Sequence, residues 1–173
     1  GFIKIAVNKG PLVPVQRLIV RAAALTQQAT GLTVACHTSD AVSAHEALDI
    51  VESARMDPGR FIVVHAQNMP SEAEQDALAA RGGWLSYDNI GGAPGLDAYA
   101  RLILYALDKG RLGRILISHD AGWYHVGEPG GGLLRPITVI LDEFLPMLRR
   151  LGMDGALEQT LLVDNPRRAF EIA

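Results

Sequence analysis

The segment RFIVVH, Arg60 to His65, is a short run of mostly β-branched apolar residues that ends in a histidine. A run of this length and composition is typical of a buried strand in a parallel sheet. Similar runs recur along the chain, so the predicted strands are Phe2 to Val7, Leu32 to His37, Arg60 to His65, Trp84 to Tyr87 and Arg114 to Ser118.

Longer segments of helical period separate these strands. The predicted helices are Val15 to Thr30, Ala41 to Arg55, Pro70 to Arg81, Leu96 to Lys109 and Arg135 to Leu151, with a last short helix opening at Asn165-Pro166. Gly31, Gly82 and Gly110 fall where a left-handed residue ends a helix, and Ser71 with Glu74 resembles a capping box. Strands that alternate with helices predict an α/β fold with a parallel sheet.

The ends of the predicted strands follow one another at intervals of 23 to 33 residues, close to one βα unit each. A complete (β/α) barrel takes about 250 residues, and this chain opens inside an apolar strand. We therefore expect residues 1–173 to be one catalytic-domain portion, about the last five βα units of a TIM barrel, with the first strands outside the chain. The alternative is an open five-stranded, doubly wound sheet. No G-x-G-x-x-G or P-loop follows the first strand, which disfavours a nucleotide-binding domain.

Composition narrows the class of protein further. Hydrophobic residues make up 49% of the chain and charged residues 20%, as in a globular domain. The net charge of −3 and the absence of a basic block exclude nucleic acid as a good partner. No apolar run approaches the roughly 20 residues of a membrane helix. The single cysteine, Cys36, lies in an apolar run and is expected to be a buried thiol, so we expect a soluble, cytoplasmic protein.

Polar residues stand near the ends of four predicted strands. Because side chains alternate along a strand, Lys4 shares a face with Phe2 and Ala6, and His37 shares a face with Thr33 and Ala35. The same reasoning groups His65 with Phe61 and Val63, and Asp120 with Leu116 and Ser118, leaving His119 toward the helices. We therefore place Lys4, His37, His65 and Asp120 on the inner face, where barrel enzymes carry their catalytic residues.

Each of these residues also has a structural interpretation. A strand-end histidine is often only hydrogen-bonded, a strand lysine often reaches water, and an aspartate after a strand often caps the next helix. A lysine, two histidines and an aspartate in one barrel mouth are costly to bury without a counter-ion, and a divalent metal removes that cost. Imidazole and carboxylate are ordinary zinc or manganese ligands, whereas an ammonium is not, so Lys4 must change chemically to bind a metal.

The segments GFIKIAV, VACHTS, IVVHAQN, ISHDAGW and VDNPRRAF resemble, in order and spacing, the later strands and C-terminal helix of phosphotriesterase-like hydrolases of the amidohydrolase superfamily. The resemblance implies two divalent metal ions, with zinc the first expectation and manganese, cobalt or iron as alternatives. It implies that carboxylated Lys4 bridges the metals as a carbamate, that His37 and His65 bind one metal, and that Asp120 binds the other and handles the proton of the attacking water.

One feature of that family is missing from this sequence. Family members carry a His-x-His pair on the first strand for the second metal, and this chain has none. His45 lies in a predicted helix and His125 in a predicted loop, so neither replaces the pair. We expect the first barrel units to lie outside this chain, and the chain to form a homo-oligomer such as a dimer or to associate with the missing N-terminal part.

The loops carry the remaining expectations. Residues 121–134 form a long irregular stretch with three consecutive glycines, typical of a mobile access loop. Trp123, Tyr124 and His125 in this loop could line an apolar pocket or simply pack. Asp88 could orient a ligand or cap a turn, and Asn89 stands where lactone-hydrolysing relatives often have an arginine.

Two functions are therefore in competition. The first is a hydrolase of an ester, lactone or phosphotriester that activates water with a binuclear metal site bridged by a carboxylated lysine. The second is a catalytically silent binding or scaffold relative that lacks the first-strand ligands.

Overall fold

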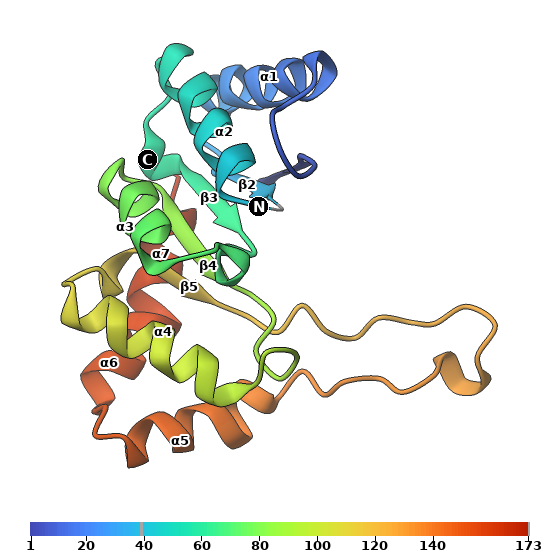
Figure 1. The fold of residues 1–173 in the computed structure, drawn as a ribbon, viewed down its shortest axis with the longest axis vertical. Helices are drawn as coiled ribbons and strands as arrows, with labels where there is room; N and C mark the ends of the chain where they lie inside the picture. The colour runs from blue at the N-terminus through green and yellow to red at the C-terminus, as the bar shows by residue number, and fades with distance from the viewer. Residues whose placement is uncertain (39, 173) are drawn as a thin grey trace.

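The computed structural model describes residues 1–38 and 40–172. Five parallel strands form a single sheet in the order β1-β2-β3-β4-β5, so each strand pairs with its neighbours in the sequence (Figure 1). The strands are β1 Ile3–Ala6, β2 Val34–His37, β3 Phe61–Val64, β4 Trp84–Tyr87 and β5 Ile115–Ile117. All five predicted strands are present, each within two residues of its predicted ends.

Four helices connect consecutive strands, as the pattern of the sequence predicts. They are α1 Pro14–Thr30, α2 Ala41–Ser53, α3 Glu72–Ala80 and α4 Leu96–Asp108. Gly31 ends α1 in the left-handed conformation that glycine adopts without strain, with φ of 73°. The Ser71 hydroxyl accepts the backbone N–H of Glu74, but the Glu74 carboxylate binds His45 on α2, so only half of the predicted capping box forms.

The two faces of the sheet differ in what covers them. One face packs under α1 to α4 in a large apolar cluster that includes Phe61, Val63, Leu85 and Ile115 of the strands, all fully buried. The other face carries a much smaller cluster of Ala35, Ile62, Trp84, Leu116 and Ala169. We call these the helix face and the inner face.

Within the described residues, β1 and β5 each pair on one side only, so this chain is not a closed barrel. The fold is five consecutive βα units of barrel type arranged as an open wall (Figure 1). This confirms the predicted parallel α/β architecture. It also leaves the inner face of β1 uncovered, where Phe2, Lys4 and Ala6 are exposed.

The alternation predicted for β3 is wrong in one respect. The alternation predicts Phe61 and Val63 on the inner face with His65, but both are buried in the helix face, and Ile62 lies on the inner face with Val64 packed against it. His65 still reaches the inner side because its φ is +64°, a left-handed conformation that ends the alternation after Val64. The prediction for His65 was therefore right for a reason that the strand pattern does not contain.

The helix predicted for Arg135 to Leu151 is also shorter than expected. Helical structure begins at Val139, continues as a π-helical turn η5 Ile140–Phe144, and becomes α5 Leu145–Arg150. Residues 135–138 are not helical, and Arg135 instead binds across to the loops that precede the arm and follow β4.

The last helix is longer than the sequence predicts. Helical structure begins with α6 Gly155–Gln159, ten residues before Asn165, and Asp154 caps it by accepting two backbone N–H groups. It continues through the π-helical turn η6 Thr160–Asp164 into α7 Asn165–Phe170. Each π-helical turn precedes a proline, Pro146 or Pro166, where the wider turn accommodates the missing N–H donor. None of the helices in the described part of the chain is both long and apolar enough to cross a membrane.

Candidate active site

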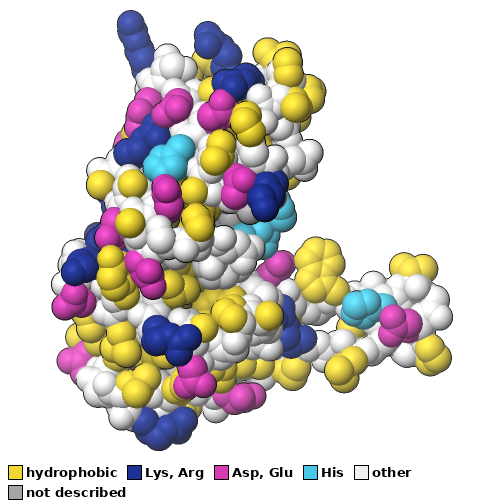
Figure 2. Space-filling view, in the orientation of Figure 1, with side chains coloured by type: hydrophobic (Ala, Val, Ile, Leu, Met, Phe, Trp, Pro, Cys, Tyr) yellow, Lys and Arg dark blue, Asp and Glu magenta, His cyan; other side chains and the backbone are white. Residues whose placement is uncertain are grey.

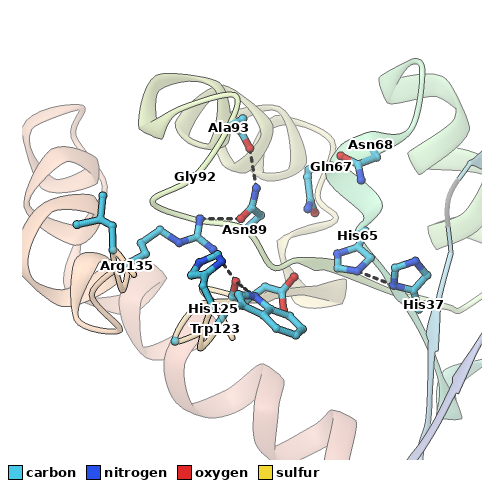
Figure 3. Close-up of a pocket in the computed structure, with 13 residues that line it drawn as sticks. His37, His65, Gln67, Asn68, Asn89, Gly92, Ala93, Trp123, His125 and Arg135 are labelled. Carbon is cyan, nitrogen blue, oxygen red and sulfur yellow. Dashed lines mark hydrogen bonds between the residues drawn. The ribbon is translucent and has the colours of Figure 1, made fainter. Parts of the chain in front are cut away.

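Two histidines face each other at the carboxyl ends of β2 and β3. His37 is the last residue of β2, and His65 follows β3. Nδ1 of His37 and Nε2 of His65 are 2.8 Å apart, and the two rings meet edge to face (Figure 3). Parallel neighbouring strands end at the same edge of a sheet, which is why residues 28 positions apart in the sequence come into contact.

A buried carboxylate fixes the orientation of His65. Asp88, directly after β4, has a side chain that is only 6% exposed. Its Oδ1 lies 2.5 Å from Nδ1 of His65, and its Oδ2 accepts the backbone N–H of His65 at 2.8 Å. Asp88 thus holds the strained backbone of His65 and also directs Nε2 of that ring toward the cavity. The sequence analysis had left the role of Asp88 open between orienting a ligand and capping a turn.

The imidazole of His37 favours its neutral form. Burial lowers the pKa of His37, and the charges of His65 and Lys4 lower it further. A neutral imidazole carries a free lone pair on one ring nitrogen, the state that metal ligands and general bases need. The thiol of neighbouring Cys36 points into the helix face, where burial raises its pKa to about 12 and leaves it inert.

The four predicted site residues line one cavity over the inner face. Lys4, His37, His65 and Asp120 border a space of about 610 Å³ together with apolar residues such as Phe2, Ile62 and Phe170. Lys4 is exposed on β1 and Asp120 is exposed after β5, so they approach the histidines from opposite edges of the sheet. The structure therefore brings these residues to one opening, as the strand positions predict.

A second cavity of about 590 Å³ continues outward from the same histidines. His37, His65, Asp120 and Trp123 border it, and polar side chains from three loops complete it, namely Gln67, Asn68, Asn89, His125 and Arg135 (Figure 3). Gln67 also contacts the site directly, because its amide donates to Oδ1 of Asp88 at 3.0 Å. The sequence analysis missed Gln67 and Arg135, since neither carries a motif signal.

Residues 121–134 form an arm that extends away from the body of the chain (Figure 1). Its only regular structure in the described residues is a short 3-10 turn, Pro129–Gly131. Apolar side chains are exposed along it, with Val126 and Leu133 more than 90% exposed (Figure 2). Trp123 and His125 border the outer cavity, which is the pocket-lining alternative of the sequence analysis. Tyr124 instead packs against Gly131 within the arm.

His45 and His119 lie outside this site. His45 of α2 pairs with Glu74 at 3.0 Å on the helix side of the sheet. His119 accepts the backbone N–H of Ile140 on its Nε2 at 2.9 Å, which agrees with its predicted place opposite Asp120.

The donor set fits part of a metal site. Two nitrogen ligands of one zinc ion lie about 3.3 Å apart, so the rings of His37 and His65 need only a small separation to share an ion. Among residues 1–38 and 40–172, however, no group of three or more histidine, cysteine or carboxylate side chains is arranged to hold a metal. Lys4 belongs to none of those residue types, and its ammonium has no lone pair to offer a metal ion.

An open wall of parallel βα units, with histidine and carboxylate side chains at the carboxyl ends of its strands, is a portion of a barrel-type fold. The model of the phosphotriesterase family matches residues 1–170, and the chain belongs to that family.

The similarity extends over nearly the whole chain. The chain is 27% identical over 184 residues to a phosphotriesterase homology protein of Mycobacterium tuberculosis, and the match covers 99% of this chain and 55% of that protein. It is 25% identical over 188 residues to an aryldialkylphosphatase of Saccharolobus solfataricus, covering 98% of this chain and 57% of that enzyme. The chain thus spans about half the length of the curated relatives it matches.

A solved structure shows the same fold. It comes from the engineering of organophosphate hydrolysis activity on a weak promiscuous lactonase template, and it superposes with a TM-score of 0.86 at 28% sequence identity. The match covers 98% of this chain and 57% of that structure. The open wall described above therefore corresponds to a portion of a phosphotriesterase barrel.

Proposed function

We propose that this chain supplies His37, His65, Lys4 and Asp120 to the active site of a metal-dependent hydrolase that cleaves an ester, lactone or phosphotriester. The observation that carries the proposal is the facing pair of His37 and His65, with the buried carboxylate of Asp88 behind it. A histidine that donates to a carboxylate through one nitrogen and presents the other to a cavity is the usual arrangement of a metal ligand.

Each residue has a distinct task in this proposal. His37 and His65 would offer ring nitrogens to one metal ion, and Asp88 would hold the ring of His65 in place through its Nδ1. Lys4, once its amine had taken up carbon dioxide and released a proton to solvent, would offer carbamate oxygens in place of an ammonium. Asp120 would hold the second ion and would accept the proton of the attacking water. Two bound divalent ions lower the pKa of water and polarise the electrophilic oxygen of the substrate.

Zinc is the first candidate for both ions, with manganese, cobalt or iron as alternatives. The His-x-His ligands for the second ion have to come from another polypeptide segment. We therefore propose that the active form, a cytoplasmic catalytic domain, is a complex with a segment carrying such a pair. A homo-oligomer would cover the open edges of the sheet but would bring no His-x-His pair, because every copy of the chain lacks one. The uncovered inner face of β1 and the single-sided pairing of β1 and β5 in the described chain support such association.

The substrate class rests on relatives and on the cavity. The name aryldialkylphosphatase supports a phosphotriester, and the lactonase template supports a lactone. The outer cavity joins the amides of Gln67, Asn68 and Asn89 to the apolar surface of Trp123, which suits a neutral ester with an apolar group.

The test combines metal analysis with a substrate panel. We expect wild-type protein, grown with zinc and supplied with a segment that carries a His-x-His pair, to retain metal through dialysis and to hydrolyse at least one aryl ester, lactone or phosphotriester. His37→Ala and His65→Ala should lose metal and turnover together. His45→Ala removes a histidine outside the cavity and should retain both. Hydrolysis that persists unchanged in both cavity variants contradicts the proposal.

A catalytically silent binding relative is the second candidate. It is favoured by one observation, that the described residues hold no ready group of three carboxylate, histidine or cysteine donors. The same panel separates the two candidates, because a silent relative retains at most weakly bound metal and hydrolyses none of the substrates.

A further inference from the structure

The neck of the arm is closed by one arginine. Nη2 of Arg135 donates to the backbone carbonyls of His119 and Asp120, both at 2.6 Å. Its Nη1 donates to Oδ1 of Asn89 at 2.7 Å (Figure 3). Arg135 follows the arm, His119 and Asp120 precede it, and Asn89 belongs to the loop after β4. A single guanidinium thus joins three separate segments, which its planar fork of donors suits better than a lysine ammonium does.

Two further hydrogen bonds reinforce the same neck. The Nε1–H of Trp123 donates to the carbonyl of Asp120 at 3.0 Å, so that oxygen receives both an indole and a guanidinium donor. The backbone N–H of Ile140 donates to the ring of His119 at 2.9 Å. Both residues that lead into the arm are therefore held by residues that lie after it.

Asp120, whose carbonyl accepts two of these hydrogen bonds, has an unfavourable backbone conformation. Asp120 has φ of +43°, in the left-handed region that non-glycine residues rarely adopt. Such a conformation persists only where its surroundings hold it in place, and it decides where the carboxylate points. The contacts that hold the Asp120 peptide come from Arg135 and Trp123 and not from its own strand.

Gly92 leaves the space that the guanidinium occupies. A Cβ atom at Gly92 would lie 2.1 Å from Nη1 of Arg135 and 2.6 Å from Oδ1 of Asn89, closer than real atoms approach. No left-handed φ is recorded at Gly92, so the glycine is needed there for space and not for backbone freedom. Replacing Gly92 with alanine therefore displaces the guanidinium while leaving Arg135 in the chain.

We propose that Arg135 is a positioning residue for Asp120: its guanidinium clamps the neck of the arm and holds the Asp120 carboxylate at the mouth of the cavity. The effect on turnover rests on the proposed hydrolase function, whereas the effect on the order of the neck does not. Arg135 itself needs no contact with the substrate in this role.

Two variants test the clamp from different sides. Arg135→Ala removes the donors, and Gly92→Ala pushes them aside. Each has a matched control, since Arg101 is an exposed arginine of α4 and a Cβ at Gly155 meets nothing within 4 Å. We expect both test variants, and neither Arg101→Ala nor Gly155→Ala, to lower kcat by about ten- to a hundred-fold with KM little changed, because a misplaced catalytic group slows the chemical step.

Readouts independent of turnover accompany the kinetics on the full chain. Amide hydrogen exchange should quicken in residues 119–125 and 133–141 of both test variants and stay unchanged in α1 and α2. The near-ultraviolet circular dichroism of Trp123 should weaken, with buried Trp84 as a constant background. Millimolar guanidinium chloride should partly restore kcat to Arg135→Ala, because a free guanidinium can enter the vacated position, but it should not restore Gly92→Ala.

The outcomes are distinguishable. If wild-type protein supplied with a segment that carries a His-x-His pair hydrolyses none of the substrates, the proposed function fails, and hydrogen exchange and circular dichroism alone decide whether the clamp exists. If wild-type protein turns over and Arg135→Ala keeps the kcat of Arg101→Ala, the inference is overturned, even where exchange quickens. Uniform loss of protection throughout the chain, without rescue by guanidinium, also overturns it, because that result marks a general structural role.

Discussion

The helix face and the inner face of the sheet are built by the same five strands but serve different purposes. On the helix face Phe61, Val63 and Leu85 have no exposed surface. On the inner face Phe2 is 51% exposed, and Lys4 is exposed beside it. The difference indicates that the free energy of folding comes mainly from the helix face, while the proposed site lies on the inner face.

The largest expected effect is on stability and compares two phenylalanines. We expect Phe61→Ala to lower the free energy of unfolding by about 3–5 kcal/mol, because it leaves a cavity under the helices. Phe2→Ala removes a half-exposed ring whose tilted contact with Phe170 spans 5.6 Å between centroids, and it should cost no more than about 1 kcal/mol. Chemical denaturation measures both changes, and equal losses would show that the two faces do not differ in this way.

Asp120 should behave in the opposite sense, with a large effect on turnover and a small one on stability. In the completed site, we expect Asp120→Asn to lower kcat at least about a hundred-fold, because an amide cannot accept the proton of the attacking water. The melting temperature should change little, since the side chain is exposed. A variant that retains near-normal kcat but melts several degrees lower would instead assign Asp120 the role of a structural cap.

Lys4 tests whether the uncovered edge of the inner face contributes to metal binding. We expect Lys4→Ala to reduce bound metal by about ten-fold or more, because the bridging oxygen ligands are lost. Added short carboxylates should partly restore it by replacing the carbamate. Lys109→Ala, at the end of α4, is the control and should keep its metal. Unchanged metal stoichiometry in Lys4→Ala excludes a bridging role.

The smallest effect concerns His119 and the pH dependence of stability. Burial and the charge of Arg135 lower the pKa of His119 from its ordinary value of 6.5. The unfolded chain therefore binds more protons than the folded chain just below pH 6.5, and stability falls as the pH drops through that range. In metal-free protein, His119→Gln should lose less stability than wild type between pH 7.5 and about pH 5.5. An identical loss would mean that other groups control the stability in this pH range. His37 is one of them, because its pKa is also lowered.

Hydrophobic periodicity predicted all five strands and the four helices between them. Buried parallel strands require short apolar runs and amphipathic helices require apolar residues at the helical period, so both are visible in the sequence. Periodicity failed after the arm, where the helix starts at Val139 instead of Arg135. It also failed near Asn165, where capping by Asp154 starts the helix ten residues earlier. Caps and long-range contacts, which have no period, decided those boundaries.

The sequence by itself determined the parallel α/β wall and the four residues, Lys4, His37, His65 and Asp120, that meet at one opening. Their positions near the strand ends predicted a common edge, because parallel strands bring their carboxyl ends together, although the side of the sheet on which His65 lies depends on its left-handed backbone. Only the tertiary structure decided how the site is held. Asp88 binds His65 from 23 residues away, and Arg135 binds Asn89 from 46 residues away. The left-handed backbones of His65 and Asp120 depend on such contacts, which form between loops that only the folded chain brings together.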